Sequence, residues 1–339
     1  MVDRSCSSNM DSARSTLILD MNHTGLGTLD EFSLMVLFGN YHSQYLTEGL
    51  SHNASQIVDV KNNVLYPAYF MTHMRVPPSV PLHSFSLWDQ ISIETKVCRY
   101  GDTILDSTYS AGRMEDQVTP CITMQANSVF ILDPAITRTR YKQVSAPRLG
   151  GVRDMERLKV PPQALQESAR VRACGFDGAE RLQLAAEPYR YTLEFNRDTA
   201  PGRPLIFAKI PLLMELSERE FLRGLTRSRI SEEILQAVSL LERKTFYYGN
   251  AFSGNELLLY TKGAIENCSE SLWKENPKQQ YVYRLTYETE LYDNGDLLAI
   301  SRSDKAIVYE ISSQPLIQDT KRLLKPTASG AGINHERYV

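Results

Sequence analysis

The sequence predicts an α+β protein made of two copies of one unit, each with a buried helix and several antiparallel strands. Each half of the 339-residue chain starts with a short strand-like segment, a turn and an apolar helix. Each half then continues into segments in which apolar and polar residues alternate, as they do in half-buried strands. The same order of elements in both halves indicates an internal duplication.

The first half begins with an apolar strand over residues 17–21, which a glycine-containing turn follows. A helix is expected over residues 29–46, because Thr28 and Glu31 have the spacing of a capping box. The body of this helix is apolar nearly all round, which indicates burial against a sheet. Residues 91–98 alternate between apolar and polar side chains and predict a half-buried strand.

The second half repeats this order. An alternating strand is expected over residues 189–195, and a helix begins near Pro211, a residue type that suits the first helical turn. A further helical stretch is expected from Ser231 to Leu241. The triplet Asp293–Gly295 is a strong hairpin signal. The predicted strands of this half are 257–260, 281–291, 297–300 and 306–311.

Breaks in composition predict the domain organisation. The basic segment 146–165, which contains proline and glycine, reads as a linker between a first domain, 15–145, and a second domain, 166–320. Residues 1–14 are polar and rich in serine, and residues 321–339 lack apolar periodicity. Both ends are therefore predicted to be disordered tails.

Composition excludes several classes of function. The net charge of −3 disfavours nucleic acid as a partner, since phosphate binding needs a basic surface. No apolar run reaches the roughly 18 residues that cross a bilayer, so no membrane partner is predicted. The N-terminus lacks the apolar core of a signal peptide, which predicts a cytoplasmic protein. Scattered cysteines and histidines without ligand spacing predict free thiols, no metal and no bound cofactor.

Five segments together resemble the LnmK-like double-hotdog family, whose type member is an acyltransferase/decarboxylase of leinamycin biosynthesis. The segments are 21–31 (MNHTGLGTLDE), 65–75 (LYPAYFMTHMR), 88–93 (WDQISI), 194–208 and 246–257. Their order covers nearly the whole chain between residues 17 and 310. The resemblance implies a double hotdog, in which an antiparallel sheet wraps around a long helix in each half.

The resemblance also implies a function in polyketide or related secondary metabolism. The substrate would be an acyl-CoA or an acyl-carrier-protein thioester, with its phosphopantetheine arm in a groove between the two hotdogs. The implied reaction is acyl transfer with or without decarboxylation, and the partner is a carrier protein or polyketide synthase. Because the chain already contains paired hotdogs, a monomer or homodimer is expected. Tyr66 matches the tyrosine that accepts the acyl group in the type member.

Tyr66 is therefore the first candidate catalytic residue. A phenol has a pKa of about 10, so a nucleophilic role requires a cation or strong donor that lowers this pKa by about three units. In a regular strand His73 would point to the opposite face, which leaves His23 as the better partner. The alternative is that Tyr66 only packs in the sheet.

His23 and Asn196 are the other catalytic candidates. His23 could act as a base with a carboxylate in a dehydratase, thioesterase or cyclase, or it could be structural. Asn196 precedes the second helix as Asn22 precedes the first, and both offer amide donors for a thioester carbonyl or stabilise a turn. A non-catalytic acyl- or carrier-protein-binding accessory also fits the fold. The further substrate-binding candidates are Gly27, Tyr69, Gly249 and Asn250.

Overall fold

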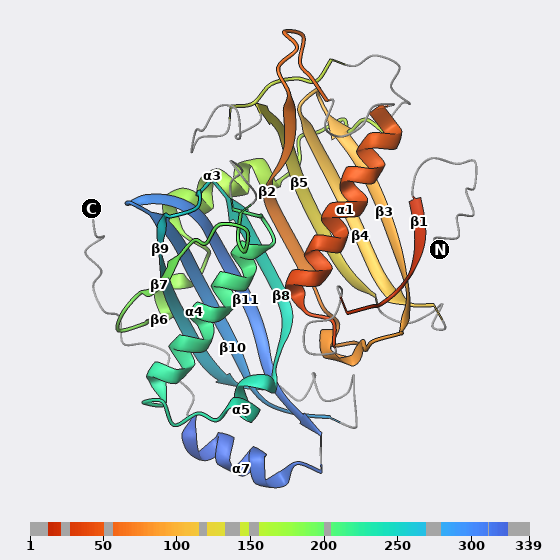
Figure 1. Cartoon of the computed structure of the whole chain (residues 1–339). Coiled ribbons are helices and arrows are strands. Elements are labelled where there is room, and N and C mark those ends of the chain that lie inside the picture. Colours follow the sequence, from red (N-terminus) through yellow and green to blue (C-terminus); the bar gives the residue numbers. More distant parts are fainter. Residues whose placement is uncertain are drawn as a thin grey trace.

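One antiparallel sheet runs through both halves of the chain (Figure 1). A computed structural model describes the chain outside residues 1–12, 22–27, 51–56, 115–120, 133–142, 149–155, 200–204, 269–278, 311 and 325–339, and describes no side chains for 47–50. The described residues form eleven strands, joined in the order β1-β3-β4-β5-β2-β8-β11-β10-β9-β6, with β7 also paired to β9.

The first half supplies β1 to β5 and the long helix α1. Their bounds are β1 Ala13–Ile18, α1 Glu31–Leu50, β2 Leu65–Arg75, β3 Gln90–Tyr100, β4 Ile104–Arg113 and β5 Ile122–Leu132. The helix α3, Ala164–Cys174, connects the halves. The second half contains β6 Gln183–Leu184, β7 Tyr189–Thr192, α4 Lys209–Leu225, α5 Glu232–Gln236, β8 Val238–Tyr247, β9 Glu256–Asn267, β10 Gln279–Asp293, β11 Asp296–Glu310 and α7 Gln314–Leu323.

The strand order confirms the predicted double hotdog. Reading outward from the centre, the first half runs β2-β5-β4-β3-β1 and the second runs β8-β11-β10-β9-β7. Each central strand thus follows the long helix of its own half. The two halves join where β2 pairs with β8, from Met71 opposite Phe246 to Arg75 opposite Glu242. The long helices α1 and α4 lie on the same face of this sheet (Figure 1).

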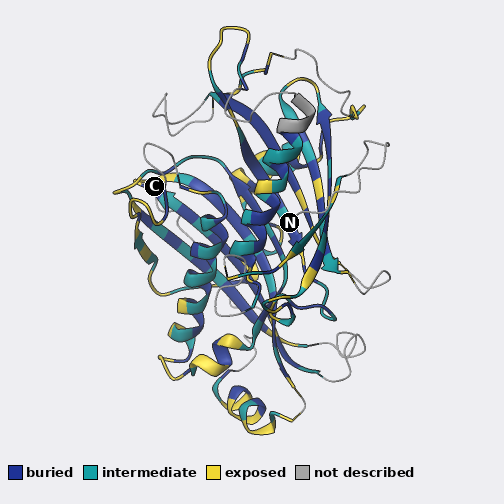
Figure 2. Ribbon diagram, turned by 45° about the vertical axis from the view of Figure 1, so that its right-hand side comes forward, coloured by how far each residue is buried: buried dark blue, intermediate teal, exposed yellow. Residues whose placement is uncertain are grey.

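The strands are largely buried (Figure 2), and the two faces of the sheet carry different apolar clusters. On the inner face, α1 and α4 pack on the strands and form the largest buried apolar cluster, which includes Leu34, Phe38 and Leu213. On the outer face, Ala164 and Val171 of α3 pack across the junction of the halves. The inner face therefore holds the space between the two long helices, and the outer face is bridged by the connecting helix.

Several predicted boundaries are corrected by tertiary contacts. The first strand begins at Ala13 and ends at Ile18, because this segment pairs with β3 from Thr95 to Gln90. The predicted N-terminal tail therefore included two strand residues. At the other end, α7 extends to Leu323, and the next residue, Leu324, is 2% exposed. The predicted linker likewise ends early, since α3 begins at Ala164.

The helical stretch predicted from Ser231 to Leu241 is wrong in its second half. Ser231 does cap a helix through its hydroxyl, which accepts from the amide of Ile234 at 3.4 Å. That helix ends at Gln236, and β8 begins at Val238 between β2 and β11. Pairing on both edges overrides the helical spacing of the apolar residues. The strands predicted over 297–300 and 306–311 fall on one strand, β11, which ends at Glu310.

The predicted hairpin is confirmed, and the predicted capping box is not. Asn294 and Gly295 both have positive φ, 49° and 84°, as a tight two-residue hairpin requires. At the start of α1 the amide of Ser33 donates to Oδ1 of Asp30 at 2.6 Å. Glu31, the expected reciprocal cap, instead turns its carboxylate into the interior toward Arg243.

Candidate active site

The start of α4 lies against the N-terminal half of α1, and the contact between them is called here the seam. The ring of Phe207, two residues before α4, comes so near Gly39 of α1 that a Cβ at Gly39 would lie 3.0 Å from it. The ammonium group of Lys209, the first residue of α4, lies 4.7 Å from the centre of the Phe32 ring on α1. Both contacts bring side chains of the second half onto the first half.

The floor of the seam is formed by the two strands that join the halves. On β2, Thr72 hydrogen-bonds through its hydroxyl with the hydroxyl of Tyr247 on β8, at 2.9 Å. Tyr69 of β2 contacts Phe207 with its ring at 4.5 Å between centroids. Burial raises the pKa of Tyr69 and of Tyr247. Both phenols therefore remain protonated at neutral pH, which suits them to hydrogen-bond donation rather than to nucleophilic attack.

A buried ionic network lies next to this floor and crosses between the halves. Arg243 of β8, 2% exposed, donates to Glu218 of α4 at 2.8 Å and pairs with Glu31 of α1 at 3.0 Å. Lys305 of β11 pairs with the other oxygen of Glu218 at 2.8 Å. Burial raises the pKa of Glu31, whereas the charges of Arg243 and Lys305 overcome burial and lower the pKa of Glu218. The network fixes the first residue of α1 to the second half.

The side-chain amide of Asn250, shortly after the end of β8, has no hydrogen-bond acceptor among the described residues. The Nδ2 atom of Asn250 is buried and makes no hydrogen bond there. Asn250 precedes Ala251, whose carbonyl accepts from the amide of Leu205 at 2.8 Å. This hydrogen bond holds Asn250 beside the segment that leads into Phe207 and α4. A buried donor without an acceptor is suited to a substrate oxygen.

A second carboxylate organises the connection between β7 and α4. Asp198, 1% exposed, accepts from the hydroxyl of Tyr191 at 3.0 Å and from the amide of Glu194 at 2.9 Å. It also accepts from Arg197 at 3.4 Å and lies 3.8 Å from Lys209. Burial by itself would raise the pKa of Asp198, but these hydrogen bonds outweigh burial and lower the pKa. Asp198 thereby holds two cations at the edge of the seam.

Behind Tyr69, a buried histidine ties together the interior of the first half. Nδ1 of His42 on α1 hydrogen-bonds with the hydroxyl of Tyr109 at 2.9 Å and with that of Ser107 at 3.3 Å. The hydroxyl of Ser128 reaches Nε2 at 3.4 Å. Burial lowers the pKa of His42 to about 4, so the ring is neutral at pH 7. His42 is thus a packing and hydrogen-bonding group rather than a cation.

This pKa predicts a pH-dependent stability. The folded-state pKa of His42 lies below the ordinary value of about 6.5, so the unfolded chain binds more protons between these values. The free energy of unfolding should therefore fall by about 2 kcal/mol from pH 7 to pH 5 through this residue alone. Urea unfolding of the wild type and of His42→Asn at pH 7 and pH 5 measures this fall. An equal fall in the free energy of unfolding in both proteins would contradict the prediction.

Tyr66, the predicted acyl acceptor, lies away from the seam. Its neighbour Leu65 packs beneath α1, while Ala68 and Phe70 pack on α3, so Tyr66 points to the outer face and is 39% exposed. A bulge between Tyr69 and Met71 shifts the register. The expectation that His73 faces away from Tyr66 is therefore wrong, because the extra residue returns both to one face.

The other predicted residues divide into three groups. Tyr69 lies in the floor of the seam, and Asn250 lies beside the segment that leads into α4. Gly249 precedes Asn250 and donates its amide to the carbonyl of Leu298 at 3.3 Å. Asn196 is exposed in a turn, with a positive φ of 65° that matches the turn-stabilising alternative. His23, Asn22 and Gly27 lie outside the described residues, so their roles stay predictions. Sequence reasoning missed the seam residues Phe207, Lys209, Asp198 and Arg243.

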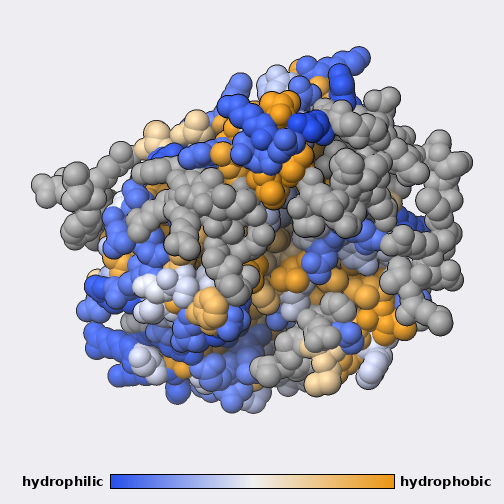
Figure 3. Space-filling view, turned by 45° about the horizontal axis from the view of Figure 1, so that its top comes forward, coloured by the Kyte–Doolittle hydropathy of each residue, from blue (hydrophilic) through white to orange (hydrophobic). Residues whose placement is uncertain are grey.

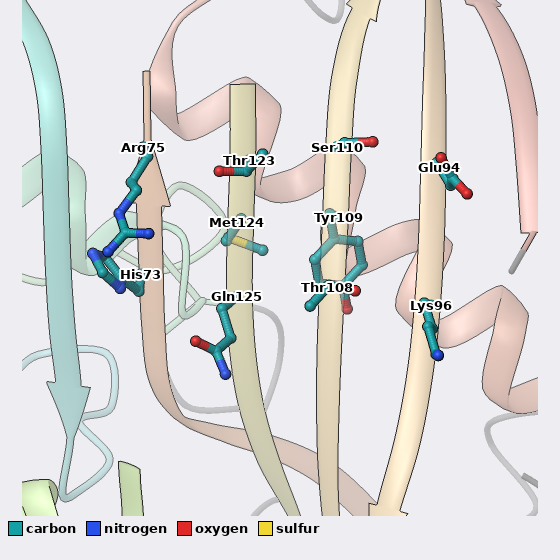
Figure 4. A pocket seen from close by; sticks show the side chains of 10 residues that line it. All are labelled: His73, Arg75, Glu94, Lys96, Thr108, Tyr109, Ser110, Thr123, Met124 and Gln125. Carbon is teal, nitrogen blue, oxygen red and sulfur yellow. The ribbon is translucent and has the colours of Figure 1, made fainter. Parts of the chain in front are cut away.

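The outer face of the first half carries a polar groove of about 510 Å³ (Figure 4). Its basic side chains already have carboxylate partners. His73 and Arg75 both bind Glu242, whose pKa the His73 hydrogen bond lowers to about 2, and Lys96 pairs with Glu156 at 2.7 Å. The groove therefore offers little net positive charge to an anion. Its lining is His73, Arg75, Glu94, Lys96, Thr108, Tyr109, Ser110, Thr123, Met124 and Gln125.

The face of the molecule seen in Figure 3 is mixed in character, with hydrophobic residues between hydrophilic ones. Across the described residues, no group of three or more His, Cys, Asp or Glu side chains is arranged to hold a metal ion. In the same part of the chain no helix is both long and apolar enough to cross a bilayer.

Comparisons with solved structures support this fold across nearly the whole chain. An acyl-ACP thioesterase from Bacteroides thetaiotaomicron superposes with a TM-score of 0.52 at 12% identity, over 88% of this chain and 98% of its own. A protein described as an oleoyl thioesterase from Lactobacillus plantarum gives 0.54 at 10% identity, over 89% and 99%. The 12:0-ACP thioesterase from Umbellularia californica gives 0.51 at 9%, over 88% and 99%.

These similarities define the class of fold. The chain has the double-hotdog architecture of the three thioesterases, and at this level of identity the likeness concerns the fold alone. No protein-family model matches the chain, and no curated protein is significantly similar to it. The LnmK-like subtype therefore stays a prediction from the sequence.

Proposed function

We propose that this protein is an enzyme that acts on acyl groups carried as pantetheine thioesters, either acyl-CoA or acyl carrier protein. The reacting carbonyl would lie at the seam between α1 and α4. The observation that carries the proposal is the buried amide of Asn250, which has no acceptor among the described residues and follows Tyr247 by three positions, together with the protonated phenols Tyr69 and Tyr247 in the floor of the seam. The double hotdog that holds them resembles an acyl-ACP thioesterase over nearly its full length. A thioester carbonyl is an acceptor that matches such donors.

The favoured reaction is hydrolysis. A water oxygen bonds to the thioester carbon, the carbon–sulfur bond breaks, and the sulfur leaves as a thiol with a proton from that water. Negative charge develops on the carbonyl oxygen, where protonated phenols and an amide stabilise it. The raised pKa of Tyr69 supports this donor role and disfavours a phenolate nucleophile at the seam. His23 stays the predicted base.

Acyl transfer with or without decarboxylation, in a polyketide pathway, is the second candidate. It is favoured by the sequence segments that resemble the LnmK-like family, including the one that carries Tyr66. Its acyl acceptor would lie on the outer face of the sheet, away from the donors of the seam. A covalent Tyr66 adduct is thus the product that separates the two candidates.

Incubation of the full-length protein with acetyl-, malonyl-, methylmalonyl- and hexanoyl-CoA tests both. Thiol release, carbon dioxide and the intact protein mass are measured together. We expect thiol release with no stable adduct, and equal rates for the wild type and Tyr66→Phe. An adduct that disappears in Tyr66→Phe would instead establish acyl transfer. Binding without any thiol release would favour a non-catalytic accessory and contradict the proposed enzyme.

A further inference from the structure

We infer that the seam accepts only short acyl groups and that Phe207 sets their upper length. This inference rests on the proposed function, since it concerns the acyl group of the same thioester. It follows from what fills the inner face on either side of the seam. One side is packed with rings, the other carries buried charges, and Phe207 closes the space between them.

Phe207 is inserted from the second half into the first. Its ring centroid lies 4.5 Å from that of Tyr69 on β2, and a Cβ at Gly39 of α1 would lie 3.0 Å from the ring. A larger residue at position 39 would crowd the ring, so glycine favours this insertion. The ring therefore occupies the gap between α1 and β2 through which an alkyl chain would enter the first half.

Beyond Phe207 the interior of the first half is already occupied. Tyr69 lies 5.3 Å from the ring of His42, and Tyr109 both hydrogen-bonds with His42 and stacks on Phe38 at 5.0 Å. Together with Phe207, these side chains form a continuous series of five packed rings from the seam to the middle of α1. A close-packed interior has no room for added methylenes without displacing a ring. A long chain therefore cannot extend in this direction.

The second half excludes a long chain for a different reason. Beneath the first turns of α4, the inner face is filled by buried apolar side chains such as Leu213 and Leu259, which leave no free room. Further along α4 it carries the Arg243, Glu218 and Lys305 network, and Ser303 donates to Glu218 at 2.8 Å. Ser217, Thr261 and Thr289 continue the polar interior further along α4. An alkyl chain offers these groups no hydrogen bonds, so inserting it would leave buried charges uncompensated. The acyl group is thereby confined to the seam.

Binding of two non-hydrolysable thioethers, S-ethyl-CoA and S-hexyl-CoA, tests the inference by isothermal titration calorimetry. The wild type should bind S-hexyl-CoA no more tightly than S-ethyl-CoA. In Phe207→Ala the removed ring should admit the longer chain, and the affinity for S-hexyl-CoA should rise about 10-fold or more. Phe207→Leu, a gentler change, should give a smaller gain in the same direction.

The matched control is Phe221→Ala, which removes the same ring from the core under the far end of α4, where it packs on Tyr287. This variant should show no gain for S-hexyl-CoA. Tight binding of S-hexyl-CoA by the wild type, no gain in either Phe207 variant, or no binding of any analogue would overturn the inference. Thiol release from acetyl-CoA is scored separately, so an inactive protein that shows the expected binding would refute only the proposed function.

Discussion

Replacing Arg243 by methionine should lower the free energy of unfolding by about 3–5 kcal/mol, the usual cost of removing one partner from a buried ion pair. The guanidinium group is the cation shared by Glu31 and Glu218, at 3.0 and 2.8 Å. Without it both carboxylates remain in the interior with Lys305 as the remaining close cation. Urea unfolding at pH 7 measures the change.

Two comparisons make this result specific. Arg284→Met removes an equally short but half-exposed pair with Asp304, at 2.9 Å, and should cost only about 0–1 kcal/mol. Adding Glu31→Gln to Arg243→Met should recover part of the loss, because it neutralises a carboxylate that lost its partner. If Arg243→Met cost no more than Arg284→Met, the interior of the second half would have to be hydrated.

Removing a donor from the seam should slow the proposed reaction by about 10²–10³-fold in kcat, as the loss of one oxyanion donor does in other acyl-transfer enzymes. Tyr69→Phe deletes one hydroxyl, and Asn250→Ala deletes the amide that has no partner among the described residues. The expected fall is in kcat, with KM little changed, because the donors act when negative charge develops on oxygen.

Tyr281→Phe is the control for this pair. Tyr281 is 2% exposed, and its hydroxyl donates to the carbonyl of Pro78 at 3.1 Å, outside the seam. Its loss should leave kcat for thiol release unchanged. Wild-type rates in both Tyr69→Phe and Asn250→Ala would remove the seam from the mechanism, and the reacting carbonyl would then have to lie elsewhere on the protein.

Much of the fold follows from local patterns in the sequence. Alternation predicted β3 and β10, and the Asp293–Gly295 triplet predicted the hairpin between β10 and β11, because these signals depend only on adjacent residues. The rule that alternate residues of a strand share one face failed at β2. There the bulge after Tyr69 inserts an extra residue and reverses the faces of the strand residues that follow. No local signal marked that bulge.

The site was less predictable, because its members come together only through tertiary contacts. Tyr69 and Asn250 were among the candidates, but Glu31 was read as a helix cap although its partner Arg243 lies more than two hundred positions along the chain. One signal was present in the sequence. Two positions on either side of Arg243 are an apolar and a hydroxyl residue, Leu241 and Thr245, and an ionic residue on such a strand face needs a buried partner.

The pairing of β2 with β8 has a consequence for the evolution of the chain. Because the two repeats share one hydrogen-bond ladder, neither could be cut away without leaving an open strand edge prone to self-association. The repeats are therefore bound to be inherited together, while their interiors are free to diverge. The first repeat has packed rings around His42 and the second has a buried ionic network around Arg243, so the backbone retains a symmetry that these side chains do not share.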